Sequence, residues 1–168
     1  MNFIDEAYLE VRAGDGGSGA SSFRREKYIP FGGPDGGDGG KGGNIFFKVN
    51  QNTNTLIDFQ NKKIFEAKNG QKGSGKNKSG ADGDDLVIHV PKGTVIYDNL
   101  TNEELMDCTD ENLEYLIVKG GEGGHGNARF KSATNRAPRK STPGFKGEVR
   151  SLSCLLYTSP SPRDTIRS

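Results

Sequence analysis

The chain of 168 residues is poor in apolar side chains, which make up 31% of it, against roughly 45–50% in an ordinary globular domain. No apolar run approaches the roughly 18 residues that a membrane-spanning helix needs. The first ten residues, MNFIDEAYLE, are acidic and lack the apolar centre of a secretory signal. Two cysteines, Cys108 and Cys154, suggest no disulfide framework. These shortages predict a cytoplasmic protein with one domain-sized core.

Long amphipathic helices are also missing. The best helical candidate, residues 102–116, contains acidic residues that interrupt any apolar stripe. Short alternating stretches rich in β-branched and aromatic residues predict strands instead; they lie at 7–12, 44–49, 62–67, 85–90, 93–98 and 114–119. Several short strands separated by turn signals predict a mainly β fold with a small barrel or sandwich as its base.

Glycine is abundant where apolar residues are scarce, with 25 in the chain, about twice the average usage of roughly 7%. The glycines gather in four inserts between the expected strands, at 14–19, 32–43, 70–83 and 120–126. From 33 to 42, and again from 120 to 126, glycine recurs at every third position. Because polyproline II has three residues per turn, this period lines one face with glycine. It favours left-handed segments packed side by side over the flexible linker that such composition otherwise suggests.

Nucleotide and metal motifs are only approximated. Two glycine fingerprints, at 14–19 and 121–126, leave no room for the helix that a dinucleotide site requires. The stretch GQKGSGKN, residues 70–77, nearly matches a P-loop, but Asn77 replaces the hydroxyl residue that ligates Mg²⁺. The glycine repeats lack the aspartate that a calcium-binding repeat needs. We therefore expect no catalytic site, bound cofactor or metal in this chain.

The net charge of +1 conceals a segregation of charge along the chain. Residues 98–114 hold seven acidic and no basic residues, whereas 127–150 hold seven basic residues against Glu148 alone. Residues 62–78 add six lysines against Glu66. Cations on projecting loops suit RNA, because they meet phosphates while rings or guanidinium planes stack on exposed bases. An ordinary solvated charged surface is the alternative.

The last residues differ from the rest. The stretch CLLYTSPSPRD, residues 154–164, matches one reading frame of a sequencing-library transposon adapter; a Ser/Pro-rich disordered tail is the alternative. We expect 1–152 to be the domain and 153–168 to be a non-native tail that contributes no fold element.

Seven stretches, in order, carry a family resemblance: AGDGGSG, SFRREKYIPFGGPDGGDGGKGG, NTLIDF, VPKGTVIYD, KGGEGGHGNARFKS, NRAPR and TPGFKGE. From Met1 to about Leu152 the chain resembles the N-terminal glycine-rich domain of the Obg family of GTPases. The resemblance implies left-handed glycine-rich helices on a small β barrel, a role in assembly of the large ribosomal subunit, and loop tips that contact ribosomal RNA. The RNA-binding residues that it implies are Lys27, Lys76, Arg136 and Arg139, joined by Arg25, Lys78, Arg129 and Lys140.

A family member would continue past residue 152 into a GTPase domain. The resemblance therefore assigns GTP binding, Mg²⁺ and hydrolysis to a portion absent here, and we expect this chain to be a monomer. A protein-interaction module that regulates the attached enzyme without contacting RNA is the alternative function. A nucleotide-binding enzyme is disfavoured by the motifs that fail.

Overall fold

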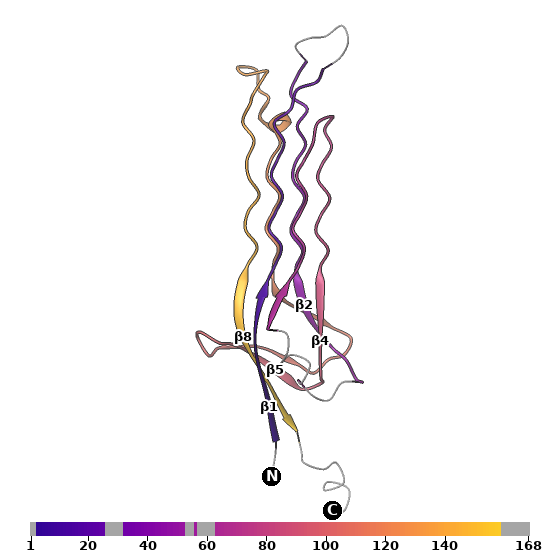
Figure 1. The fold of residues 1–168 in the computed structure, drawn as a ribbon, viewed down its shortest axis with the longest axis vertical. Coiled ribbons are helices and arrows are strands. Elements are labelled where there is room, and N and C mark those ends of the chain that lie inside the picture. Colours follow the sequence, from indigo (N-terminus) through magenta and orange to yellow (C-terminus); the bar gives the residue numbers. More distant parts are fainter. Residues whose placement is uncertain (1–2, 26–31, 53–55, 57–62, 159–168) are drawn as a thin grey trace, which may run out of the picture.

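The structure, a computed structural model of the chain, describes residues 3–25, 32–52, 56 and 63–158. A base of β-strands carries a long bundle of extended segments that projects to one side (Figure 1). The bundle is continuous with the base, because β1, β2, β3, β4, β7 and β8 each adjoin a glycine-rich segment along the chain.

Two mixed sheets form the base within the described residues. The larger has the strand order β3-β1-β8-β5-β6, and the smaller has the order β4-β2-β7. The strands are β1 (Phe3–Arg12), β2 (Ile45–Val49), β3 (Ile64–Glu66), β4 (Leu86–Val90), β5 (Thr94–Asp98), β6 (Glu104–Cys108), β7 (Glu114–Val118) and β8 (Val149–Thr158). The mainly β class is confirmed, but neither sheet closes into a barrel in this part of the chain, because the edge strands β3 and β6 do not pair with each other.

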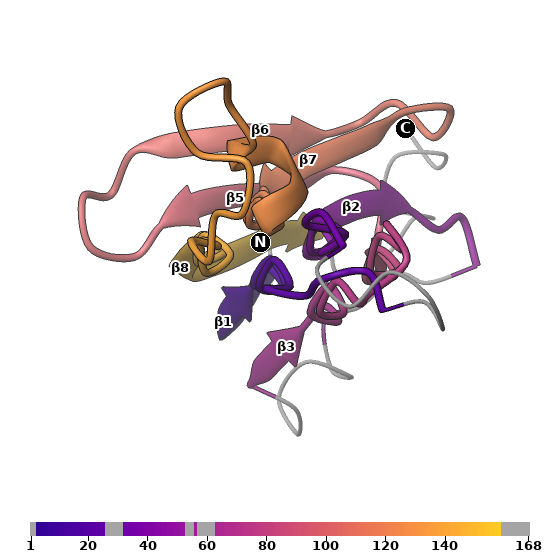
Figure 2. The same ribbon diagram turned by 90° about the horizontal axis from the view of Figure 1, so that it is seen from above.

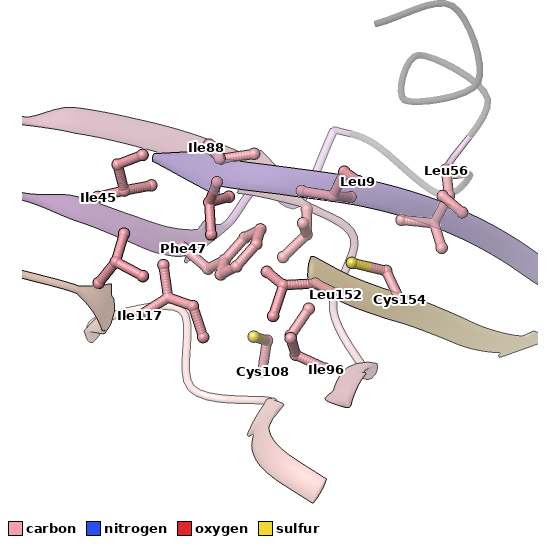
Figure 3. Packing of buried hydrophobic residues seen from close by; sticks show 14 of the residues in the cluster. Leu9, Ile45, Phe47, Leu56, Ile88, Ile96, Cys108, Ile117, Leu152 and Cys154 are labelled. Atoms are coloured by element: carbon pink, nitrogen blue, oxygen red, sulfur yellow. The ribbon is translucent and has the colours of Figure 1, made fainter. Parts of the chain in front are cut away.

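The hydrophobic core draws on both sheets. Leu9 and Val11 of β1 are buried, as their alternation predicts. Figure 3 shows Phe47 of β2 pointing among residues of the larger sheet, such as Leu152 of β8. Each such aromatic or aliphatic side chain contributes about 1.5–3 kcal/mol when fully buried. The base is therefore stabilised mainly by hydrophobic packing of the two sheets against each other.

Residues 102–116, the best helical candidate, form β6, a turn and β7 instead. Helical structure in the described residues amounts to one short 3₁₀ helix, η2 (Asn127–Phe130). A search of these same residues finds no helix long and apolar enough to cross a membrane.

The expectation that residues 153–168 contribute no fold element is wrong for 153–158. These residues continue β8, which pairs antiparallel with β1 on one side and with β5 on the other. Cys154 and Leu156 are buried and alternate with Ser153 and Leu155, so the stretch has the period of two that a half-buried strand requires. That residues 153–168 are non-native stays a prediction.

Six extended segments of the described chain form the bundle, at 13–20, 35–44, 67–74, 78–85, 119–126 and 142–148. Neighbouring backbones exchange hydrogen bonds at every third residue; for example, the N–H groups of Gly14, Gly17 and Ala20 donate to the carbonyl oxygens of Gly43, Gly40 and Gly37, each at 2.9 Å. Figure 2, seen from above, shows the segments as tight coils viewed end-on. The packed arrangement predicted from the glycine period is confirmed.

Close backbone contact explains why glycine is required. A Cβ placed on Gly39 would lie 1.8 Å from the carbonyl oxygen of Gly17, and one on Gly42 would lie 1.8 Å from that of Gly14. Gly33 differs, since its nearest neighbour would be the Nζ atom of Lys131 at 3.7 Å. The first glycine of the period therefore lies outside the close packing. The left-handed polyproline II conformation itself stays a prediction.

Candidate nucleic-acid interface at the bundle tip

Three loops lie at the end of the bundle away from the base (Figure 1). We call them loop A (20–25 with 32–34), loop B (75–77) and loop C (127–141). They join the extended segments in pairs, so their positions are set by the bundle beneath them. Lys27, a predicted RNA contact, lies outside the described residues.

Loop B is the apex of a tight hairpin between Ser74 and Lys78. Lys76 and Asn77 adopt left-handed backbone conformations, with φ values of 63° and 56°. Buried Asp35 holds this turn: its Oδ2 accepts the N–H of Lys76 at 3.0 Å, and its carbonyl oxygen accepts the N–H of Asn77 at 2.7 Å. The Lys76 side chain is thereby presented at the apex. The P-loop-like stretch is thus a hairpin, without the helix that a P-loop precedes.

Loop C begins with η2, and its cations have different surroundings. Arg129 pairs with Asp38, its Nη2 lying 2.6 Å from Oδ2. Burial raises the pKa of Asp38, but hydrogen bonds from Arg129 and from the amide of Gly126 outweigh it and hold that pKa below its usual value. The Nζ atom of Lys140 lies 5.2 Å from the ring centre of Phe130, a cation–π distance. Arg129 and Lys140 therefore help to shape loop C.

A hollow of about 560 Å³ lies between loops A and C. The charged side chains that line it are all cationic, and Phe23, Gly32 and Gly33 also line it. The cations are Arg24, Arg25, Lys131, Arg136 and Arg139, and all five are exposed. We call this feature the cationic hollow. A second hollow, of about 810 Å³, opens between loops A and B; Lys76 lines it, and it shares Arg24 and Arg25 with the first.

The structure brings most of the predicted site residues to this tip. Arg25, Arg136 and Arg139 line the cationic hollow, and Lys76 lines the second one. Lys78 is exposed at the foot of loop B. Arg24 and Lys131 were not singled out from the sequence, although Lys131 belongs to the basic stretch 127–150 and Arg24 to the stretch SFRREKY, which carries part of the family resemblance. Only the fold shows that these two stretches, more than a hundred positions apart, face one hollow.

Among the described residues, no three or more His, Cys, Asp or Glu side chains form a group that could hold a metal ion. What this tip offers chemically is positive charge, donor groups and one aromatic ring, which together are suited to a phosphate-rich partner.

A β base that carries a glycine-packed bundle with a cationic far end defines a class of projecting domain. In comparison with known proteins, the GTP1/OBG family model matches residues 4–158, and the chain belongs to that family. The match extends past residue 152 to the end of β8.

Two curated relatives are each named GTPase Obg. The protein from Psychrobacter sp. (strain PRwf-1) is 55% identical over 152 residues, which cover 90% of this chain and 38% of that protein. The protein from Buchnera aphidicola subsp. Acyrthosiphon pisum (strain Tuc7) is 57% identical over 156 residues, which cover 93% of this chain and 47% of that protein. The chain thus spans less than half the length of these relatives.

Proposed function

We propose that this chain is the ribosome-binding module of an Obg-type GTPase that acts in assembly of the large ribosomal subunit. In this role the tip loops contact ribosomal RNA, and the base connects the bundle to the rest of the protein. The module works as a monomer in the cytoplasm. GTP and Mg²⁺ are bound, and GTP is hydrolysed, by a part of the intact protein that lies outside this chain, as the GTPase names of its relatives suggest.

One observation carries the proposal: five exposed cations from two separate loops line a single hollow at the end of a long projection. Like charges gathered on one surface repel each other, and binding of a partner of opposite charge relieves this repulsion. Arginine predominates, and its planar guanidinium both pairs with phosphate oxygens and stacks on bases.

The shape supports RNA as the partner. The interlocked backbones of the bundle have no bulky side chains along their contacts, which keeps the projection narrow. A narrow projection whose segments are hydrogen-bonded to one another can place its cations inside a crevice of a large RNA particle. A compact domain would be too wide to enter such a crevice. Because the loops are joined by the bundle, their ordering cost on binding is reduced.

The test is charge reversal at the tip, with a matched control in the base. Arg136→Glu with Arg139→Glu should weaken binding to purified large ribosomal subunits by at least ~100-fold, since each lost phosphate contact in a charged pair is worth about 1.5–3 kcal/mol. Lys63→Glu with Lys92→Glu changes the net charge equally at two exposed positions of the base and should leave the affinity within about threefold. Equal weakening by both pairs would refute a specific tip interface.

The alternative is a regulatory module that binds protein and not RNA. It is favoured by two exposed leucines of the base, Leu100 in the turn between β5 and β6 and Leu113 in the turn between β6 and β7, which lie among the acidic residues of 98–114. If either turn served as the functional interface, Leu100→Ser or Leu113→Ser would abolish subunit association and the tip charge reversal would not.

A further inference from the structure

Asn127 is a buried polar residue where loops A and C meet. It begins η2, and its side chain is fully buried. Its Oδ1 accepts the N–H of Gly36 at 2.8 Å, while its Nδ2 donates to the carbonyl oxygens of Ser22 at 2.9 Å and Pro138 at 3.0 Å. A carboxamide has one acceptor oxygen and two N–H donors, so every polar group of this side chain has a partner.

The two carbonyl groups that Asn127 bridges lie beside the cations of the hollow. Ser22 precedes Arg24 by two positions in loop A, and Pro138 lies between Arg136 and Arg139 in loop C. A second link joins the same loops, since the Oγ of Ser21 donates to the carbonyl oxygen of Arg139 at 2.8 Å. A third link is the backbone N–H of Asn127, which donates to the carbonyl oxygen of Ala20 at 2.9 Å. The width of the cationic hollow is therefore set by a few hydrogen bonds between the loops, and two of these three are made by Asn127.

We propose that Asn127 is the positioning residue of the cationic hollow. By bridging the carbonyl groups of Ser22 and Pro138 it fixes the separation of loops A and C, and with it the arrangement of the arginines that meet phosphate. Because its side chain is buried, Asn127 acts on a ligand only through these loops. The inference rests on the proposed RNA-binding function.

Substitution of Asn127 by Asp offers a sharp test because it keeps the shape and removes the donors. An ionised carboxylate would face two carbonyl oxygens at the positions where Nδ2 now donates, which leaves a buried charge repelled by both. Burial and this repulsion raise the pKa of the introduced carboxyl group. Protonation then restores one donor, so the defect is present above that raised pKa and diminishes as the pH falls through it.

The binding experiment compares wild type with N127D on purified large ribosomal subunits. At about pH 7.5, N127D should bind about tenfold more weakly, the effect expected from unpaired buried groups. At about pH 5.5 much of the affinity should return, since the introduced carboxyl group becomes protonated. Asp35, Asp38, Arg129 and His125 are charged or titratable groups of the same region, so wild type is measured at both pH values to correct for their response.

Amide hydrogen exchange supplies a readout that does not depend on RNA. In N127D the amides of Asp35 and Arg24, which donate to the loop A carbonyl oxygens of Ser22 and Gly33, should exchange faster, while those of Val11 and Phe47 in the base stay protected. If base protection is lost as well, Ser21→Ala, which removes only the bond to Arg139, becomes the test variant, and it should loosen the tip amides without affecting the base.

The outcomes separate the two proposals. If N127D binds subunits with wild-type affinity at the higher pH although its tip amides exchange faster, the positioning role is overturned. If N127D still binds weakly at the lower pH, the positioning role is overturned too. Such a result would indicate a general structural defect, which protonation of one carboxyl group does not repair. If wild type itself does not bind subunits, the proposed function is wrong. Unchanged exchange of Asp35 and Arg24 in N127D would then reject the bridge itself.

Discussion

Individual glycines in the bundle differ in how much space surrounds them, and this difference sets their tolerance to substitution. Gly39 and Gly42 face carbonyl oxygens of neighbouring backbones, whereas Gly33 faces only the end of a flexible lysine side chain. The carbonyl oxygens of Gly14 and Gly17 accept N–H groups from segment 119–126, and the N–H groups of the same two residues donate to segment 35–44, so neither can move without disturbing several segments. The same residue type therefore has a steric role at some positions and none at others.

Gly42→Ala should lower the free energy of unfolding by about 3 kcal/mol or more, since its methyl carbon would lie 1.8 Å from the Gly14 oxygen and overpacking on this scale forces the backbone to shift. Gly33→Ala is the matched control and should change stability by less than about 0.5 kcal/mol. Urea unfolding followed by circular dichroism measures both. Comparable losses in the two variants would show that crowding is not the reason for glycine at position 42.

The ion pair between Arg129 and Asp38 predicts a pH-dependent stability. The pKa of Asp38 lies below its usual value, so the pair contributes stability above the ordinary carboxylate range, and this contribution is lost as the pH falls through the lowered pKa. Arg129→Ala should therefore destabilise the domain at neutral pH by less than about 1 kcal/mol, because Arg129 is 60% exposed and water screens the pair.

The difference between Arg129→Ala and wild type should shrink in acid, where Asp38 is protonated in both proteins. Urea unfolding at neutral pH and below the lowered pKa checks this, with Arg136→Ala as the control from the same loop. A constant difference across the pH range would mean that Arg129 stabilises loop C by packing of its stem and not by charge.

At the scale of elements, β8 is a strand that was not predicted from the sequence, and its second half lies in the stretch expected to contribute no fold element. Residues 153–158 pair with β1 and β5 and supply Cys154 and Leu156 to the core. Burial raises the pKa of Cys154 to about 12, with a smaller contribution from Cys108. Burial, with a contribution from Asp107, likewise raises the pKa of Cys108 to about 12.

Both cysteines should therefore react slowly with iodoacetamide in the native protein at about pH 8, since thiolate is the reactive form and a raised pKa keeps its fraction small until the pH approaches that value. Both should be labelled rapidly in urea. Peptide mass spectrometry distinguishes the two sites, and Cys108 in β6 serves as the internal reference. Rapid native labelling of Cys154 alone would show that 153–158 do not form the second half of β8.

The strands and the bundle could be predicted because each leaves a local period in the sequence. Short β-branched or alternating stretches identified β1, β2, β3, β4, β5 and β7, and the glycine period of three identified the packed segments. β8 was not predicted: its first residues were not singled out, and from residue 153 the likeness to an adapter was given more weight than the alternation of Leu152, Cys154 and Leu156. Periodic spacing of residue types along the chain indicates secondary structure, and it was sufficient to predict the mainly β fold class.

The candidate site was predictable only in part, for a physical reason. Its cations could be found from charge clusters, but their convergence depends on the hydrogen bonds of Asn127 to Pro138 in the same loop and to Ser22, 105 positions away. A single asparagine in a glycine-rich stretch gives no signal of such a bridge. The ion pair of Arg129 with Asp38 likewise left no signal in the sequence, and a contact of Arg129 with RNA stays a prediction.

At the scale of the whole molecule, the near-zero net charge results from a basic tip and an acidic base. The cationic hollow lies at the end of the bundle, while the acidic stretch 98–114 belongs to β5, β6, β7 and their turns in the base. Such a separation orients the molecule in the field of a polyanion, with the tip leading and the base held away. The total charge of +1 gives no indication of this polarity.

The polarity predicts how subunit binding depends on salt. If the arginines of the hollow neutralise phosphates, the logarithm of the association constant should fall linearly with the logarithm of salt concentration, by roughly 0.7–0.9 for each phosphate contacted. Replacing Arg136 and Arg139 by glutamine, which removes charge but keeps polar side chains, should make that slope shallower by about 1.4–1.8. Lys63→Gln with Lys92→Gln in the base should leave the slope unchanged, because those positions face away from the RNA. A slope that is equally shallow in wild type and in the tip variant would mean that counterion release at the hollow does not drive binding, and the RNA contact would then have to be sought on another face of the domain.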